Sequence, residues 1–328
     1  MVRNRNMYEY VLEGLILCFL CVFGIFANAF AMLYFGKQKL QKQTFYGFML
    51  TLSTIDLFFN ATCLCAFSIP ALVDCKGYTN DDCNVSIQFW QCLIWIVPLS
   101  NIFRTGSIYF TLALSIERYL VICRPLLYNL KSKITKVVRI GFILFSIIFN
   151  LPKFLEFEWG KGKYLINETK YEDEEQSIIP TSLIENNLYI QIYSIWFDLI
   201  FHGLIPFTAL IVLNTFVLKE MQRFEKRVKS DTKEEQKRFS EVYKAKFNLL
   251  VVTVFILCYS LHFVPVIYRC YYMIWKLEHE LLDIKWIWII ISLSRVLESF
   301  NSSVAFAWFL FKHRVIENLV LKTKCIYF

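Results

Sequence analysis

The segment LALSIERYLVIC places an acid, a base and a phenol in succession, Glu117, Arg118 and Tyr119, near the end of a long apolar run. One interpretation is a solvated turn of a soluble helix. The other is a charge cluster at a membrane boundary, where Arg118 needs acidic partners because an unpaired charge in lipid is costly. Glu117 is adjacent, and Glu241 stands near the start of a later apolar run. An arginine held between acids on two helices would form a latch that opens when the helices separate.

A second set of ionisable residues lies inside other apolar runs: Arg104, Asp198, His262, Arg295 and Glu298. Because unpaired charges are costly in a bilayer, we expect these side chains to face the interior of a helix bundle. They would form either an ionised ligand pocket or an internal salt-bridge network in which Glu298 pairs with Arg104 or Arg295. The two interpretations are compatible, since a ligand can exchange with an internal ion pair.

The composition indicates a membrane protein. Of the 328 residues, 57% are hydrophobic, 18% are aromatic and only 19% are charged. Soluble domains average about a quarter charged residues, so lipid is the natural solvent for this much apolar surface. A helix needs about 20 apolar residues to span a bilayer, and seven stretches qualify, near 11–35, 45–72, 88–122, 137–156, 188–218, 246–275 and 284–311.

These stretches predict an all-α membrane protein, because backbone groups in hydrocarbon must hydrogen-bond within their own segment. We expect a single domain, residues 1–328, folded as a seven-helix bundle. If the amino terminus is outside, more than half of the 35 Lys and Arg residues fall on the inner side. The positive-inside rule therefore places the amino terminus outside. The polar residues 219–246 are expected to extend the fifth and sixth helices on the inner side.

This topology puts the sequons at Asn84 and Asn167 in outer loops, where glycosylation is predicted. The net charge of +8 lies largely on the inner face, where anionic lipid favours it, so nucleic acid is not a predicted partner. Catalytic serine or cysteine sites, metal clusters and phosphate loops are not apparent, which predicts neither an enzyme nor a resident cofactor. His202 and His262 fit packed, hydrogen-bonded groups better than metal ligands.

The triplet Glu117-Arg118-Tyr119 resembles the Asp/Glu-Arg-Tyr motif of rhodopsin-like G-protein-coupled receptors. The following CRPL and the segment FKHRVIENLV, which resembles a short amphipathic eighth helix near 312–325, also fit that family. Further matches run along the chain: Asn28, Asp56, Pro206, Phe255, Cys258 and Asn301. The resemblance implies a plasma-membrane receptor that couples an extracellular ligand to a heterotrimeric G protein, with the triplet and Glu241 at the coupling end.

Three segments resemble the invertebrate FMRFamide-type neuropeptide receptors more narrowly: FNLPKFLE at 149–156, IPFTALIVLN at 205–214 and NSSVAF at 301–306. This resemblance implies a short amidated peptide ligand, and amidated Arg-Phe peptides are cationic. Four consecutive acids at 172–175, in the long outer loop near 157–187, would concentrate such a ligand at the entrance. We expect Asp198 to pair with an arginine of the ligand.

Asp56, Ser107 and Asn301 match the buried sodium site of rhodopsin-like receptors. The resemblance implies a small oxygen cage for a sodium ion, which is a sensible use of a lone carboxylate in a membrane. The alternative is a hydrogen-bonded structural cluster that holds no ion.

The cysteines depart from the rhodopsin-like pattern. The second outer loop contains no cysteine, so the usual disulfide between that loop and the third helix cannot form. We expect a bond among Cys75, Cys83 and Cys92, and the sequence leaves the pair open. Cys325 in the inner tail is a palmitoylation candidate, with a plain free thiol as the alternative.

The sixth and seventh helices depart from the pattern as well. Tyr259 and Leu261 replace the usual tryptophan and proline, while Ser302 and Ala305 stand where helix seven usually has proline and tyrosine. These changes keep other functions open. A chemosensory receptor of the same fold would bind a small molecule, and a partner receptor would not signal by itself. A transporter is disfavoured because the chain lacks an internal repeat and paired broken helices.

Overall fold

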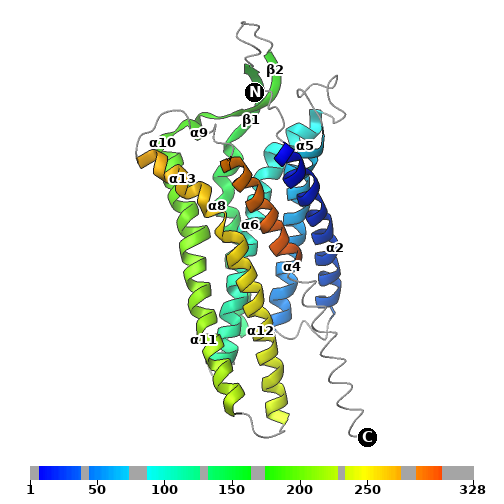
Figure 1. Cartoon of the computed structure of the whole chain (residues 1–328), viewed down its shortest axis with the longest axis vertical. Coiled ribbons are helices and arrows are strands. Elements are labelled where there is room, and N and C mark those ends of the chain that lie inside the picture. The colour runs from blue at the N-terminus through cyan, green and yellow to red at the C-terminus, as the bar shows by residue number, and fades with distance from the viewer. Residues whose placement is uncertain are drawn as a thin grey trace.

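The computed structural model describes residues 7–37, 44–73, 87–125, 132–163, 174–227, 233–274 and 286–304. Long helices run side by side in a bundle, with a small sheet at one end (Figure 1). Several predicted features lie outside the described residues: Cys75, Cys83, Asn84, Asn167, Cys325 and the eighth helix near 312–325. Cys92 is described and has a free thiol, so the predicted disulfide stays a prediction.

Six described helical runs are long and apolar enough to cross a membrane: Met7–Phe35, Thr44–Leu72, Gln88–Cys123, Val137–Leu155, Asn187–Phe224 and Lys244–Tyr271. A further helix covers residues 286–304 and is orange in Figure 1. It is less apolar because it carries Arg295, Glu298 and several serines. Glu298 and Ser299 are buried against the bundle, so the polar residues of this helix face inward. The predicted class, a helical membrane bundle, is thereby confirmed.

The first two spans consist of α-helix interrupted by wider π-helical turns. The first joins α1 (Met7–Glu9), the π-helical η1 (Tyr10–Ile16) and α2 (Leu17–Phe35). The second joins α4 (Thr44–Cys63), the π-helical η2 (Leu64–Ser68) and α5 (Ile69–Leu72). One side of the first span presents large apolar side chains outward, as Phe26 and Leu33 of α2 show at 72% and 74% exposure. Outward apolar residues are what lipid, rather than water, requires of a surface.

The third helix, α6 (Ile87–Cys123), contacts α4, α8, α11 and α12 and so occupies the middle of the bundle. Its residues Phe110, Ala113 and Leu114 pack with Phe45 and Phe48 of α4 in the largest apolar core. The fourth span is α8 (Ser132–Asn150), followed by the 3₁₀ turn η3 (Leu151–Leu155). The α-helix ends where Pro152 begins the turn, because proline supplies no backbone N–H.

The fifth span follows the short α9 (Ser182–Glu185). With α10 (Asn187–Tyr189) as its first turn, it runs through the π-helical η4 (Ile190–Leu204) into α11 (Ile205–Arg227). The sixth span, Lys244–Tyr271, lies within α12 (Lys233–Ser260) and α13 (Phe263–Ile274). The sixth span breaks between its two helices. Pro265 cannot donate a hydrogen bond to the carbonyl of Leu261, and Val264 bonds that carbonyl in a tighter turn at 3.2 Å. His262 lies at this break.

The second outer loop contains a sheet that the all-α prediction missed. Strands β1 (Phe157–Lys163) and β2 (Glu174–Pro180) pair antiparallel, with Phe157 opposite Pro180. The Thr181 hydroxyl donates to the Leu155 carbonyl at 2.6 Å, which ties the end of β2 to η3. The composition of the loop gave no membrane-span signal, and its strands are too short to be distinguished from coil by hydropathy alone.

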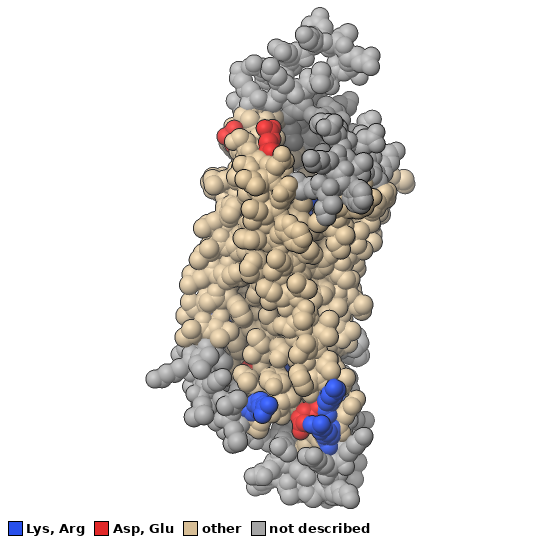
Figure 2. All heavy atoms as spheres, turned by 90° about the vertical axis from the view of Figure 1, so that its left-hand side faces the viewer, with Lys and Arg blue, Asp and Glu red and all other residues tan. Residues whose placement is uncertain are grey.

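The outer surface matches a bilayer. Figure 2 shows one long face whose middle is uncharged over the described residues. Asp and Glu are visible at the end that carries the sheet, and at the opposite end Lys and Arg gather beside further acidic atoms. Charged side chains are costly within the hydrocarbon region, so this distribution fits a belt of lipid between two aqueous faces.

Helices one, two and seven meet in a polar seam. The Asn28 amide donates to the carbonyls of Gly24 and Ser302 at 2.9 and 3.0 Å. The Asn60 amide donates to the Ser302 hydroxyl at 2.6 Å, and the Ser299 hydroxyl donates to the Asn60 carbonyl oxygen at 2.8 Å. Small residues let the backbones approach closely, and their hydrogen bonds link the three helices.

Gly24 is the tightest point of the seam. A Cβ there would lie 2.3 Å from the Ser303 hydroxyl and 2.7 Å from the Asn60 side chain, whereas a Cβ at Gly141 meets nothing within 4 Å. Overpacking of this kind costs about 1–3 kcal/mol. We therefore expect Gly24→Ala to lower the melting temperature of the purified protein by several degrees, while Gly141→Ala keeps or slightly raises it, because alanine is the better helix former. Equal melting temperatures for the two variants would contradict this packing.

Candidate functional site

A cavity of about 670 Å³ lies among the helices toward the end of the bundle that carries the sheet. Its wall is formed by α6, η3, η4, α13 and the helix at 286–304, with Phe157 of β1 beside them. All five ionisable residues predicted for a pocket line it: Arg104, Asp198, His262, Arg295 and Glu298. The structure therefore brings these five residues to one cavity, and their role as a ligand pocket stays a prediction.

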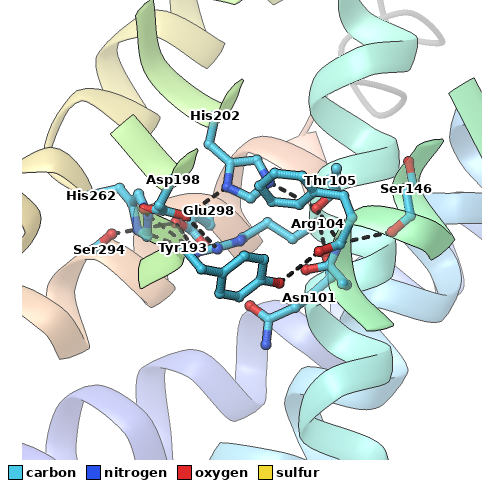
Figure 3. A network of polar contacts seen from close by, with 12 residues as sticks. Asn101, Arg104, Thr105, Ser146, Tyr193, Asp198, His202, His262, Ser294 and Glu298 are labelled. Carbon is cyan, nitrogen blue, oxygen red and sulfur yellow. Dashed lines mark hydrogen bonds and ion pairs between the residues drawn. The ribbon is translucent and has the colours of Figure 1, made fainter. Parts of the chain in front are cut away.

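Arg104 extends from α6 into a cluster of ionisable groups from three other helices (Figure 3). Its guanidinium lies 3.3 Å from His262 Nδ1, 3.7 Å from Asp198 Oδ1 and 3.9 Å from Glu298 Oε1. The Nε atom is buried and has no hydrogen-bond partner among the described residues. Arg104 thus sits between two carboxylates at distances longer than a good hydrogen bond, and its own donors are not fully used.

His262 bridges the same two carboxylates. Its Nε2 lies 3.1 Å from Asp198 Oδ2 and its Nδ1 lies 3.3 Å from Glu298 Oε1. Both ring nitrogens face carboxylate oxygens, so His262 links Asp198 to Glu298. The break in helix six places His262 in this position, between the fifth and seventh helices.

A chain of hydrogen bonds through His202, Thr105 and Asn150 holds Asp198 in position. His202 Nδ1 lies 2.7 Å from Asp198 Oδ1, and His202 Nε2 lies 2.8 Å from the Thr105 hydroxyl (Figure 3). The Asn150 amide donates to the same Thr105 oxygen at 2.8 Å. These contacts join helices three, four and five. Both histidines are hydrogen-bonded, and the described residues hold no group of three His, Cys, Asp or Glu side chains that could bind a metal ion.

Arg295 does not make the pair with Glu298 that was one of the two pairings predicted from the sequence. It forms an ion pair with Glu13 of the first helix instead of Glu298. Glu13 also accepts a hydrogen bond from Ser292 at 2.7 Å, and the Arg295 guanidinium lies 4.2 Å from the centre of the Phe67 ring. Arg295 therefore points toward helices one and two, whereas Glu298 points toward helices three and six. Spacing along one helix could not reveal this, because Glu13 is 282 residues away in sequence.

We expected Asp198 to pair with an arginine of a ligand, and this stays a prediction. In the structure the carboxylate is contacted by Arg104, His202 and His262. Arg104 is the most distant of the three, with 3.7 Å between its guanidinium and Asp198 Oδ1.

The cavity has residues that the sequence reasoning missed. Lys153 and Glu156 come from η3 and its end, Tyr189 and Tyr193 from the start of the fifth span, and Arg269 from α13. Their signal was present in FNLPKFLE, which carries Lys153 and Glu156. That segment was used only for its resemblance, because a turn after a helix has no hydrophobic period that indicates which way its side chains point.

The inner end of the bundle holds the Arg118 cluster. Arg118 is buried, forms an ion pair with Glu117 and lies 2.9 Å from Glu241. Lys244 contacts the other Glu241 oxygen at 2.7 Å. The Arg118 guanidinium also stacks over Phe45, 4.5 Å from the ring centre. The expected contacts between helices three and six are thus present, and their role as a latch stays a proposal.

Glu241 is the partly exposed member of this cluster. Burial raises the pKa of its carboxyl, but Arg118 and Lys244 outweigh burial and lower the pKa below its usual value. The carboxyl therefore stays ionised at neutral pH, as an ion pair with Arg118 requires. Tyr119 takes no part in the pair; it packs against Val217 and Val242.

The three residues of the candidate sodium site are all buried. The Ser107 hydroxyl donates to Asp56 Oδ1 at 2.7 Å. The Asn301 amide oxygen has no hydrogen-bond partner among the described residues. A carboxylate, a hydroxyl and an unused amide oxygen are suitable ligands for a hard cation. These donor types suit a sodium ion, and Ser107 and Asp56 are in direct contact. The sodium site and the structural cluster both stay predictions.

Comparison with known proteins finds similarity to seven-transmembrane receptors. The family model described as "7 transmembrane receptor (rhodopsin family)" matches residues 27–303. The FMRFamide receptor of Drosophila melanogaster is 25% identical over 315 residues, which cover 92% of this chain and 52% of that protein. The FMRFamide peptide receptor frpr-18 of Caenorhabditis elegans is 23% identical over 245 residues, covering 73% and 52%. The chain spans about half the length of these curated relatives.

The Thr105 hydroxyl generates a prediction about the wall. Removing it leaves His202 Nε2 and the Asn150 amide without their shared partner, and a buried polar group left unpaired costs about 1–3 kcal/mol. Thr105→Val should therefore lower the melting temperature. Thr253→Val is the matched control, because Thr253 is exposed and its hydroxyl bonds only the Leu249 carbonyl of its own helix. A Thr105 variant as stable as the Thr253 variant would show that this layer is not structurally important.

Proposed function

This chain belongs to the rhodopsin family of seven-transmembrane receptors, which are multi-pass membrane receptors and not enzymes. On that basis we propose that it binds a short amidated peptide containing arginine and activates a heterotrimeric G protein. The observation that carries the proposal is the cavity in which two carboxylates, Asp198 and Glu298, are held by the exchangeable Arg104. Relatives named as FMRFamide receptors support the peptide class.

The ligand step is an exchange of cations. A ligand guanidinium that enters the cavity competes with Arg104, whose contacts to Asp198 and Glu298 measure 3.7 and 3.9 Å. Guanidinium groups bind carboxylates through two parallel hydrogen bonds when the geometry allows. The ligand can therefore satisfy the carboxylates better than Arg104 does, and the displaced Arg104 can move toward the open part of the cavity.

The coupling step runs along helix six. His262 contacts both carboxylates at the break between α12 and α13. The α12 segment also carries Glu241, which pairs with Arg118 at the opposite end of the bundle. A ligand that binds better when His262 has shifted would favour the arrangement in which Glu241 has moved away from Arg118. Differential affinity for two such arrangements is what allows a ligand to switch a receptor.

A small-molecule ligand is the second candidate. The cavity of about 670 Å³ falls in the range of roughly 300–1,000 Å³ that is usual for small-molecule sites. A chemosensory receptor of the same fold would use such a cavity. The ionised wall favours the peptide, because a small apolar ligand would leave these charges without a new partner.

The first experiment is a G-protein activation assay in cells that express the tagged chain at their surface. The panel contains amidated Arg-Phe peptides, the same peptides with arginine replaced by glutamine, and unrelated peptides. We expect a saturable response to the arginine peptides, lost in Arg118→Ala. Asp198→Asn should weaken their potency by about 10-fold or more, since hydrogen bonds between charged groups contribute about 1.5–3 kcal/mol.

Ser194→Ala is the matched control for Asp198→Asn, because Ser194 lines the same cavity without a charge. Unchanged potency in Asp198→Asn at equal surface expression would remove the guanidinium exchange from the mechanism. Silence across the whole panel would favour a small-molecule receptor or a partner receptor that does not signal alone.

The latch yields a separate prediction. Glu241→Gln removes the charge that Arg118 contacts across helices three and six, so the inner end should open more often without ligand. We expect ligand-independent signalling to rise several-fold over that of the native chain. Glu220→Gln serves as the control, since Glu220 pairs only with the exposed Arg223 on its own helix at 3.2 Å. Equal basal signalling in both variants would argue against a latch at this position.

A further inference from the structure

The three carboxylates of the cavity wall already have ion-pair or hydrogen-bond partners within the protein. Asp198 is contacted by Arg104, His202 and His262. Glu298 is contacted by Arg104 and His262, and Glu156 accepts a hydrogen bond from the Tyr189 hydroxyl at 2.7 Å. The carboxylates of this wall therefore do not depend on a ligand for their compensation.

The cations divide into two groups. Arg104 is paired with two carboxylates and Arg295 is paired with Glu13. Lys153 and Arg269 also line the cavity, yet neither forms an ion pair within the described part of the chain. Glu156 and Asp198 act electrostatically on the Lys153 ammonium, but among the described residues neither lies within ion-pair distance of it. A ligand carboxylate in contact with the ammonium would add the direct pair that these acids do not make.

Lys153 is held in place by its surroundings. It lies on the short turn η3, and its ammonium sits 5.6 Å from the centre of the Tyr193 ring. The Tyr193 hydroxyl donates to the Phe149 carbonyl at 2.6 Å, and its ring stacks on Tyr189 at 5.1 Å. The phenol is therefore committed elsewhere, and only the ring face meets the ammonium. A cation over an aromatic face keeps its donors available for an anion.

Arg269 is the second of these cations. It lies on α13, where Pro265 and Val266 also line the cavity, and it is exposed. We propose that Lys153 and Arg269 form a subsite for a carboxylate of the ligand, separate from the Arg104 cluster. The inference rests on the proposed function in taking this cavity as the place where the ligand binds. It assigns the ligand a second charge, so that one molecule carries a cation for Asp198 and Glu298 and an anion for Lys153.

Ligand binding to the purified full chain in lipid nanodiscs tests the subsite without any signalling step. The probes are N-acetyl-aspartyl-phenylalaninamide, the matched N-acetyl-asparaginyl-phenylalaninamide, and the asparaginyl compound with a free carboxyl terminus. We expect a carboxylate probe to bind about 10-fold or more tightly than the uncharged amide. The aspartyl and free-acid probes distinguish a side-chain carboxylate from a terminal one.

Variants of the two cations decide the assignment. Lys153→Met should abolish the preference for carboxylate while keeping the aliphatic contact with Tyr193, and Lys153→Arg should retain it. Arg269→Gln changes an exposed position and should reduce the preference for carboxylate. It is the substitute test if the Lys153→Met protein does not fold. Equal binding of all three probes to the native chain, or an undiminished preference in Lys153→Met and Arg269→Gln, overturns the subsite. Failure of the signalling assay alone leaves this binding result unaffected.

Discussion

Hydrocarbon offers no water to a charged group, so the ionisable side chains inside this bundle are held by partners, several of them on other helices. Arg104, Asp198, His262 and Glu298 come from four different helices and converge on one point. That requirement fixes the relative rotation of helices three, five, six and seven more strictly than apolar packing can. Glu13 and Arg295 add helix one to the same arrangement.

The same constraint gives the two ends of the bundle a shared element. Helix six contributes His262 to the outer cluster and Glu241 to the inner one. Each cluster is a set of ion pairs that is either made or broken, and both depend on where one helix lies. Interaction between distant sites then needs no chain of intermediate contacts, because a single body takes part in both.

Hydropathy was sufficient to predict the helical membrane bundle, because long apolar runs have few alternatives in lipid. It also indicated which charges line the cavity, since burial of a charge follows from its place in such a run. It could not assign partners. Whether Arg295 meets Glu298 or Glu13 depends on the rotation of two helices that are distant in sequence. Lys153 was missed because it lies on the 3₁₀ turn that ends the fourth span, and the β1–β2 hairpin because it lies beyond that span; hydrophobic periodicity ends at both places.

The seam at Ser302 has a mechanical consequence. Ser302 keeps a backbone N–H that a proline at this position would lack, and its side chain is bonded to Asn60. Over the described residues, helix seven is therefore an unbroken helix that is hydrogen-bonded to helices one and two. Helix six, by contrast, has a joint at Leu261 and His262. A small rotation at that joint becomes a larger displacement at the far end of α12, so helix six acts as a lever that pivots against a fixed frame.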